Sequence, residues 1–490
     1  MTRFKRIKNY KETFIKSFKK EPLFYTLFFL IIIIGVFFRV YKWEDRIYTH
    51  SDNSLYAQIA KYSNDTLNIP QIGVFPQAQF FTGPEWLWFL QIFYLLPFGI
   101  ISPWVAMSFF SILSIFLVYY LGREIGNKWV GTVAAFFAAI SPAAIDNSFS
   151  VWNTSADPFL HILALIFLVR FYKFKKSRDI FLTALLVGIA VTVRFQLLIT
   201  IPIIAVALFS TRPKLKYFLA AVIGFIIPLL PFLIFDLRFH WFEFKRVYDY
   251  VTIAQYRIYV PNRWLTYAGV WWPSVWGSVI GSSSLVGGFL IFLVTLATIL
   301  NLKRFKKNIL YFLVAFSFIG EVFLFRYFRG ERFVYYGLFA QGPIFTLTAW
   351  ALWKVFRIQK FVGIALVAVL AVLTLPASFG NFAKRDIPLD RVQLLKQEIY
   401  SNFAPDTKFD IYGCSSVGAL MGRPLALLMY GEGRNSNKGT KIGVCWDINR
   451  KYIWVPLVDG SEKNENSWFA ATTSTTHDSA IEWWKKNPPK

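Results

Sequence analysis

Charged residues are scarce in this sequence. They make up 17% of its 490 residues, against about 25% in an ordinary soluble protein. Hydrophobic residues reach 56% and aromatic residues 19%. So much apolar surface is not hidden inside a water-soluble chain of this size, and the composition also excludes a disordered or collagen-like chain. The sequence therefore predicts an all-α polytopic membrane protein.

Cysteine is rarer still, with two residues, Cys414 and Cys445. This number excludes a disulfide-rich scaffold, and two cysteines without a partner pair of histidines do not complete a zinc site. We expect either one disulfide between them or two buried thiols on neighbouring strands. The sequence also lacks a glycine-rich phosphate loop followed by lysine, which disfavours nucleotide use. We predict no metal site and no cofactor, and a divalent-metal requirement stays open.

Acidic residues are outnumbered by basic ones, 28 against 53, so that the formal net charge is +25. In a soluble protein this excess would indicate nucleic acid as a partner. Here the basic residues gather in short loops between apolar segments, which is typical of the cytoplasmic face of a membrane protein. We therefore predict the lipid bilayer, and no nucleic acid, as the partner of these charges.

Long apolar runs dominate the first 380 residues. A helix needs about 20 apolar residues to cross a bilayer, because no water is there to satisfy its backbone groups. By this measure we expect about eleven spans. They are Pro22–Val40, Trp104–Leu121, Trp129–Ile145, Phe159–Tyr172, Ile180–Val193, Gln196–Ser210, Tyr217–Phe235, Ser284–Leu302, Asn308–Phe325, Val334–Phe356 and Phe361–Pro376.

Lysine and arginine in alternate loops set the orientation. If each span crosses once, the basic loops and the basic N-terminus, residues 1–21, all fall on one side, which the positive-inside rule makes cytoplasmic. The membrane domain is then residues 22–380, with long outer loops at 41–103 and 236–283. Because the long polar segments are all extracytoplasmic, we expect the chemistry at the outer face of the cell membrane.

The segment 381–490 differs in composition and is predicted to be a small extracytoplasmic α/β domain. The expected helices are Leu389–Tyr400, Val417–Met429 and Ser479–Lys486. The expected strands are Lys408–Cys414, Lys441–Trp446, Tyr452–Leu457 and Trp468–Thr472.

The first outer loop holds the residues best placed for chemistry. Asp52 follows the first span closely, so its carboxylate is expected at the outer water–lipid boundary, where it can accept a proton from a substrate hydroxyl. His50 and Tyr56 flank it. The aromatic segment Glu85–Ile100 is interrupted by Pro97 and is expected to lie in the membrane interface.

Several short motifs occur one after another along the sequence. They are Asp52 with Tyr56-Ala57 four residues later, the Gly83-Pro84 step into an aromatic segment ending at Phe98-Gly99, Gly122–Gly126, Ala139–Pro142 before Asn153–Asp157, and Pro231–Arg238. This order resembles GT-C membrane glycosyltransferases, in particular the protein O-mannosyltransferases and lipid A aminoarabinose transferases. The resemblance covers about residues 20 to 380. One departure is Asn53, where the family usually has glutamate.

The resemblance implies inverting transfer of a sugar from a polyprenyl-phosphate carrier, which acts as donor substrate, to a protein, lipid or cell-envelope glycan. It requires a base, for which we select Asp52, and cations that stabilise the leaving phosphate. The predicted substrate-binding residues are Arg194, Arg329, Arg332, Tyr56, Asp157 and His50.

Each assignment has a structural alternative. The alternative for Asp52 is a solvated loop carboxylate that pairs with Arg46, and the alternative for Asp157 is a helix N-cap. The outward arginines can contact lipid headgroups or pair with Asp157, Glu321 or Glu331. Glu321, inside a span, is either functional or the partner of an arginine.

Two other functions compete with transfer. A transporter or flippase for a lipid-linked sugar predicts internal repeats and charges deep in the membrane, and the sequence shows no clear repeat. A catalytically inactive relative that binds polymer or protein is the other alternative, which the departure at Asn53 keeps open.

Overall fold

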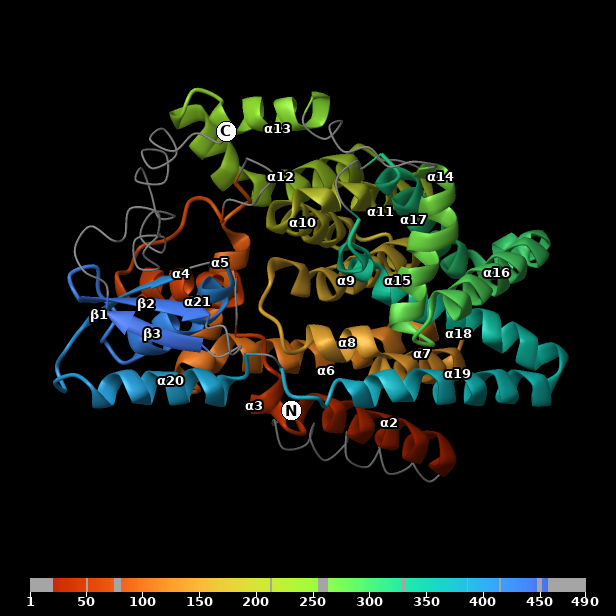
Figure 1. The fold of residues 1–490 in the computed structure, drawn as a ribbon. Coiled ribbons are helices and arrows are strands. Elements are labelled where there is room, and N and C mark those ends of the chain that lie inside the picture. The colour runs from red at the N-terminus through yellow and green to blue at the C-terminus, as the bar shows by residue number, and fades with distance from the viewer. Residues whose placement is uncertain are drawn as a thin grey trace, which may run out of the picture.

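The computed structural model describes residues 21–49, 52–74, 81–211, 214–253, 263–327, 332–385, 387–413, 416–446 and 452–456. Most of these residues are helical (Figure 1). The α-helices are α2 (Pro22–Val40), α3 (Trp43–Arg46), α4 (Asp52–Asp65), α5 (Glu85–Phe93), α6 (Ser102–Ile125), α7 (Lys128–Ile140), α8 (Pro142–Asn147), α9 (Asp157–Phe174), α10 (Ser177–Val193), α11 (Ile201–Phe209), α12 (Leu215–Arg238), α13 (Phe242–Thr252), α14 (Arg263–Thr266), α15 (Trp272–Val279), α16 (Ser284–Leu300), α17 (Ile309–Phe325), α18 (Gln341–Ile358), α19 (Lys360–Gly380), α20 (Leu389–Ser401) and α21 (Ser416–Gly431).

Short 3₁₀ and π turns join several of these helices. They are η1 (Gly99–Ile101), η2 (Asn153–Ser155), η3 (Phe195–Thr200), η5 (Tyr267–Trp271), η6 (Leu302–Asn308) and η7 (Val334–Ala340).

Apolar helices identify a multi-pass membrane protein. Among the described residues, 6 helices are long and apolar enough to cross a membrane, and a pair bent by 95°, Trp264–Val279 with Ser284–Leu300, makes up to 7. Every predicted span falls on helix, and the first has the predicted bounds. The predicted total of about eleven crossings stays a prediction.

Three predicted spans are not continuous α-helices. The segment predicted as Trp129–Ile145 divides into α7 and α8, because the Ser141 hydroxyl accepts a hydrogen bond from the Ala144 amide at 3.3 Å and Pro142 starts a new helix. Proline at the first helical position has no amide hydrogen to give to the preceding turn. Likewise, the segment Gln196–Ser210 is 3₁₀ in its first part and α-helical only from Ile201. The segment Val334–Phe356 is 3₁₀ as far as Ala340 and α-helical from Gln341.

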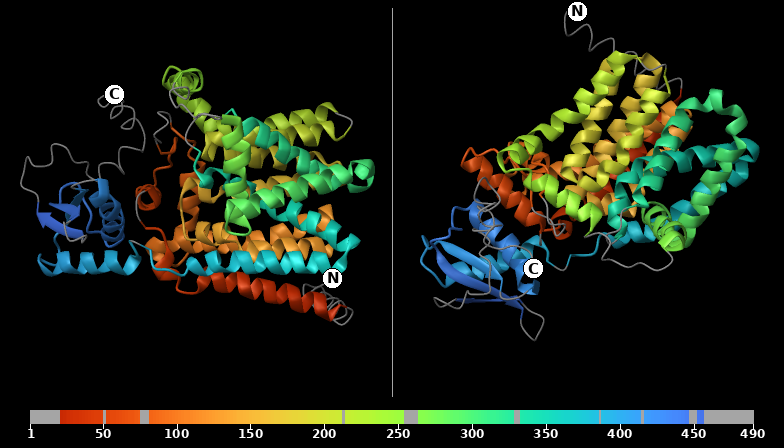
Figure 2. Two further views of the ribbon diagram at one scale, coloured as in Figure 1. Left: turned by 45° about the vertical axis from the view of Figure 1, so that its right-hand side comes forward. Right: turned by 90° about the horizontal axis from the view of Figure 1, so that it is seen from above.

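Glycine lets the long helices approach closely. α10 packs against α12 along most of its length, and Figure 2 shows the helices of the bundle lying side by side. A Cβ atom at Gly224 would lie 2.4 Å from the Phe181 carbonyl oxygen, and one at Gly188 would lie 2.7 Å from that of Phe225. Small residues at such crossings are typical of helix packing in membranes.

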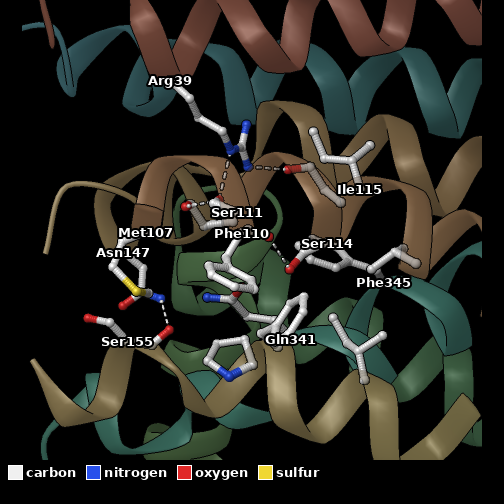
Figure 3. Close-up of a pocket in the computed structure, with 16 residues that line it drawn as sticks. Arg39, Met107, Phe110, Ser111, Ser114, Ile115, Asn147, Ser155, Gln341 and Phe345 are labelled. Atoms are coloured by element: carbon white, nitrogen blue, oxygen red, sulfur yellow. Dashed lines mark hydrogen bonds between the residues drawn. The ribbon is translucent and has the colours of Figure 1, made fainter. Parts of the chain in front are cut away.

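A buried arginine, Arg39, links α2 to α6 and α7 through hydrogen bonds. The Arg39 guanidinium donates to the Ser111 hydroxyl at 2.8 Å and to the Ala138 and Ala139 carbonyl oxygens, both at 3.0 Å. Figure 3 shows this side chain beside a cavity of about 30 Å³ that Gln341 also lines. Because its donors are satisfied by the Ser111 hydroxyl and by neighbouring backbone, Arg39 is a structural residue that the sequence analysis did not single out.

The C-terminal segment forms a sheet with two helices at one end of the bundle (Figure 1). Strands β1 (Phe409–Gly413), β2 (Thr440–Trp446) and β3 (Tyr452–Pro456) lie in the order β1-β2-β3. β1 pairs parallel with β2, with Ile411 opposite Ile442, and β2 pairs antiparallel with β3. α21 connects the parallel pair, as a crossover between parallel strands requires.

The helices and strands predicted for this segment agree with the structure wherever the structure describes them. The helices Leu389–Tyr400 and Val417–Met429 and three of the predicted strands are present within one or two residues. Trp468–Thr472 and Ser479–Lys486 lie outside the described residues. Cys445 is disulfide-bonded, and Cys414, the only other cysteine in the sequence, also lies outside them.

Candidate active site

Asp52 lies where the first outer loop meets the C-terminal segment. It is the first residue of α4, and its side chain is 53% exposed. The positive end of the helix dipole favours the charged carboxylate at this position. The Arg423 guanidinium on α21 donates to it, with 2.7 Å between Nη1 and Oδ1. Asp52 therefore combines solvent access with a cation that the sequence analysis did not anticipate.

The predicted alternative partner of Asp52 is wrong. Arg46 donates to the Tyr41 carbonyl oxygen at 2.8 Å and lies over the rings of Phe149 and Phe382, at 4.0 and 4.8 Å from their centroids. Burial and the nearby charge of Arg385 lower the pKa of Arg46 to about 10. Aromatic packing thus holds Arg46 inside the protein, away from Asp52.

Tyr56 lies one helical turn beyond Asp52 and is buried. Burial, and secondarily the Asp52 carboxylate, raise the pKa of its phenol well above the ordinary value, so that it stays neutral. The phenol also interacts electrostatically with Tyr336 on η7. Tyr56 therefore links the start of α4 with η7.

Asn53 fixes the neighbouring outer loop. Its Oδ1 accepts hydrogen bonds from the Val151 amide at 2.7 Å and the Ser150 hydroxyl at 3.0 Å, and its side chain is fully buried. Farther along this loop, the Asn153 amide donates to the Val193 carbonyl oxygen at 3.2 Å. The residue that departs from the family pattern therefore positions the segment leading to Asp157.

Arg194 and Asp157, predicted separately as substrate-binding residues, form a buried ion pair. The distance between Arg194 Nη2 and Asp157 Oδ2 is 2.7 Å, and both side chains are at most 5% exposed. Arg194 Nη2 also donates to the Tyr336 carbonyl oxygen at 3.3 Å. Within the described part of the chain, Arg194 Nε and Nη1 have no hydrogen-bond acceptor. Such unsatisfied buried donors require an explanation.

His161 and Glu321 form a second buried pair near the first. His161 lies four residues after Asp157, on the same face of α9. Its Nε2 is 2.9 Å from Glu321 Oε1 on α17. Glu321 therefore pairs with a histidine. The alternative in which Glu321 is the partner of an arginine is wrong. The sequence analysis did not predict this contact.

Three predicted residues are not brought to Asp52 by any described contact. His50 and Arg329 lie outside the described residues. Arg332 donates to the Arg326 carbonyl oxygen at 3.2 Å and lies over the Tyr267 ring at 4.8 Å. Their predicted roles stay predictions.

Glu85 was missed as a titratable group. It begins α5, is 5% exposed and lies near Thr192, two residues before Arg194. Burial raises the pKa of its carboxyl to about 7. Across the described residues no group of three or more His, Cys, Asp or Glu side chains is arranged to hold a metal, and the metal requirement stays open.

Residues 82–235 match the family model described as dolichyl-phosphate-mannose-protein mannosyltransferase. No curated protein sequence matches the chain. Among solved structures, ArnT from Cupriavidus metallidurans in the apo state aligns with a TM-score of 0.57 at 11% identity, over 88% of this chain and 93% of that one. The same protein bound to undecaprenyl phosphate gives 0.56 at 12% identity, over 88% and 94%.

An oligosaccharyltransferase from Archaeoglobus fulgidus, tethered to an acceptor peptide, aligns with a TM-score of 0.52 at 14% identity over 84% of this chain. The chain spans 64% of the length of that enzyme. These likenesses confirm the predicted resemblance: the chain has a GT-C-type fold. Within that class it is similar to the O-mannosyltransferase and aminoarabinose transferase branch.

Proposed function

We propose that this chain is a membrane glycosyltransferase that moves a sugar from a polyprenyl-phosphate carrier to an acceptor hydroxyl at the outer face of the membrane. The family-model match over residues 82–235 and the fold shared with ArnT, which binds undecaprenyl phosphate, support it. The observation that carries it is the position of Asp52, exposed at a helix start and paired with Arg423.

Asp52 acts as the base. As the acceptor oxygen forms its bond to the anomeric carbon, its proton passes to the Asp52 carboxylate. The bond from that carbon to the carrier phosphate breaks on the opposite face, and the phosphate leaves with the electron pair. This in-line displacement inverts the anomeric centre. Arg423 orients the carboxylate, and the helix dipole favours its charged form.

Arg194 is the cation best suited to the carrier phosphate. Its remaining donors, Nε and Nη1, are buried, so a hydrogen bond to a phosphate oxygen there is not weakened by water. Asp157 neutralises the guanidinium while the donor is absent. Arg329 and Arg332 are retained as further phosphate contacts, and His50 and Tyr56 as substrate contacts, on the strength of the sequence alone.

The proposed topology has about eleven crossings, a cytoplasmic N-terminus and an extracytoplasmic segment 381–490. It is supported by the docking of α21 on α4, where the rings of Tyr62 and Tyr430 lie 6.2 Å apart. Because only the short α3 separates α4 from the first span, this contact supports a C-terminal segment on the same side of the membrane as Asp52.

The decisive experiment is a mass measurement. The full chain, reconstituted in vesicles, is given a panel of polyprenyl-phosphate sugars with protein, lipid and glycan acceptors, and a new glycosidic product is expected. Asp52→Asn should abolish that product while leaving the melting temperature nearly unchanged. Labelled lipid that crosses the vesicle without a new bond would indicate a flippase instead, and binding without either would indicate an inactive relative.

A further inference from the structure

An apolar groove lies between α16 and α17. Its volume is about 450 Å³, and Trp272 and Trp276 of α15 and Leu347 of α18 form its back. Its walls are almost wholly hydrocarbon and aromatic, apart from the hydroxyls of Thr295, Thr298 and Tyr311. In a membrane-spanning bundle, a groove of this composition takes a lipid chain and not a polar ligand.

The length of the groove matches one leaflet. Its lining residues on α17 run from Tyr311 to Val322, which at 1.5 Å per residue is about 16 Å. The hydrocarbon core of a bilayer is about 30 Å thick. The groove therefore covers about half of the core, as the acyl chain of a phospholipid in a single leaflet would.

Cations surround one end of the groove. Leu302 lines it, and the next residues of η6 include the exposed Lys303, Arg304, Lys306 and Lys307. Lys354, near the end of α18, interacts electrostatically with Arg304, Lys307 and Arg357. None of these six cations forms an ion pair with any residue that the structure describes. Mutual repulsion without an acidic partner favours an external anion.

The cationic end is far from the candidate active site. η6 joins the beginning of α17, whereas Glu321, which contacts His161, lies 12 residues farther along that helix, a rise of about 18 Å. The groove reaches Val322, beside Glu321, at its other end. The phosphate of a carrier held near Arg194 therefore does not reach the cations of η6, and those cations need a different anion.

We propose that this groove is a binding site for an anionic glycerophospholipid of the bilayer. One acyl chain lies between α16 and α17, and the phosphate of the headgroup lies among Arg304, Lys307 and Lys354. Basic pockets between membrane helices are suited to such headgroups. The proposal does not rest on the proposed transferase activity.

The test is native mass spectrometry of the full chain in detergent with equal amounts of phosphatidylglycerol and phosphatidylcholine of identical acyl chains. One retained phosphatidylglycerol is expected, favoured at least tenfold. Arg304→Gln with Lys307→Gln should remove this preference, whereas the matched change Lys214→Gln with Lys216→Gln, at exposed lysines of another basic loop, should keep it. Equal retention of both lipids by the unaltered chain would overturn the proposal.

The groove is tested separately from the charges. Thr295→Trp and Ile319→Trp fill it from opposite walls at exposed positions, and each should lower retained phosphatidylglycerol tenfold. An unchanged melting temperature in either variant excludes misfolding as the cause. Soluble glycerol phosphate should compete weakly. Competition as strong as that of the lipid would show a simple phosphate site, and displacement by undecaprenyl phosphate at equal concentration would assign the groove to the sugar donor; both results would overturn the proposal.

Discussion

Arg423 Nη1 lies 2.7 Å from Asp52 Oδ1, although 371 residues separate the two in sequence. The contact joins the C-terminal segment to the first outer loop at the carboxylate that we propose as base. The C-terminal segment is therefore part of the candidate active site, because its Arg423 is a cation that forms an ion pair with Asp52. A role limited to shielding the site would not require this contact.

Loss of Arg423 should slow transfer without abolishing it. Because Asp52 is half exposed, the pair contributes about 1 kcal/mol, which corresponds to about fivefold in rate. Arg423→Ala should show this loss, and Arg423→Lys, which keeps the charge, should recover most of it. Lys396→Gln, which breaks an ion pair with Glu432 in the same segment, is the control and should leave the rate unchanged. A full rate in Arg423→Ala would exclude the arginine from the site.

Local features of the chain were predictable, and contacts between distant segments were not. Apolar runs define helices within their own length, so the apolar helices and the described C-terminal strands were located from sequence. The position of Asp52 follows from the end of the first span. Its partner Arg423 could not be found in this way, because only the packing of α21 on α4 brings it there.

Buried polar pairs were the other failure. His161 and Arg39 each occur singly in apolar helices, and a lone polar residue does not disclose its partner. The spacing of Asp157 and His161 by four residues was the one available signal, and it has meaning only once Glu321 of α17 is known to face them.

The Arg194–Asp157 pair should be strongly coupled. Arg194→Met leaves an uncompensated buried carboxylate, and Asp157→Leu leaves a buried guanidinium, so each should cost about 3 kcal/mol of stability. The double variant should cost clearly less than the sum, because neither charge is then unpaired. Thermal unfolding in detergent measures this cycle.

An exposed pair provides the contrast to this cycle. Lys384 and Asp390 are ion-paired with side chains 51% and 52% exposed, and Lys384→Met should change the melting temperature little. If the stability losses of Arg194→Met and Asp157→Leu add up in the double variant, the two side chains do not contact each other in the detergent-solubilised protein.

Glu85 should make stability depend on pH. Burial raises the pKa of its carboxyl to about 7 from 4.5, so the folded protein binds the proton more tightly than the unfolded chain. Stability is then unaffected below the unfolded pKa and falls by about 3 kcal/mol as the pH rises from 4.5 to 7. Glu85→Gln removes this loss. Melting curves should coincide with those of the unaltered chain at pH 4 and lie higher at pH 8.

The exposed Glu44 is the control for Glu85. Glu44→Gln should shift the melting temperature by the same small amount at every pH, since its carboxyl is hydrated in both states. If Glu85→Gln behaves in the same way, the Glu85 carboxyl is not held in a dry environment.

Asn53 tests whether the departure from the family pattern is structural. Asn53→Ala leaves the Val151 amide and the Ser150 hydroxyl without their acceptor in a buried site, at a cost of about 2 kcal/mol. Because the same loop leads to Asp157, transfer should fall as well. Asn64→Ala is the matched control. Asn64 lies on the same helix as Asn53, and its side-chain amide donates to the Gln91 carbonyl oxygen at 2.9 Å. Loss of this hydrogen bond should lower stability without slowing transfer. Asn53→Asp keeps the oxygen that accepts both hydrogen bonds but buries a charge. A full rate in Asn53→Asp with a reduced rate in Asn53→Ala would assign position 53 to holding the loop. Full rates in both variants would separate the loop from the reaction.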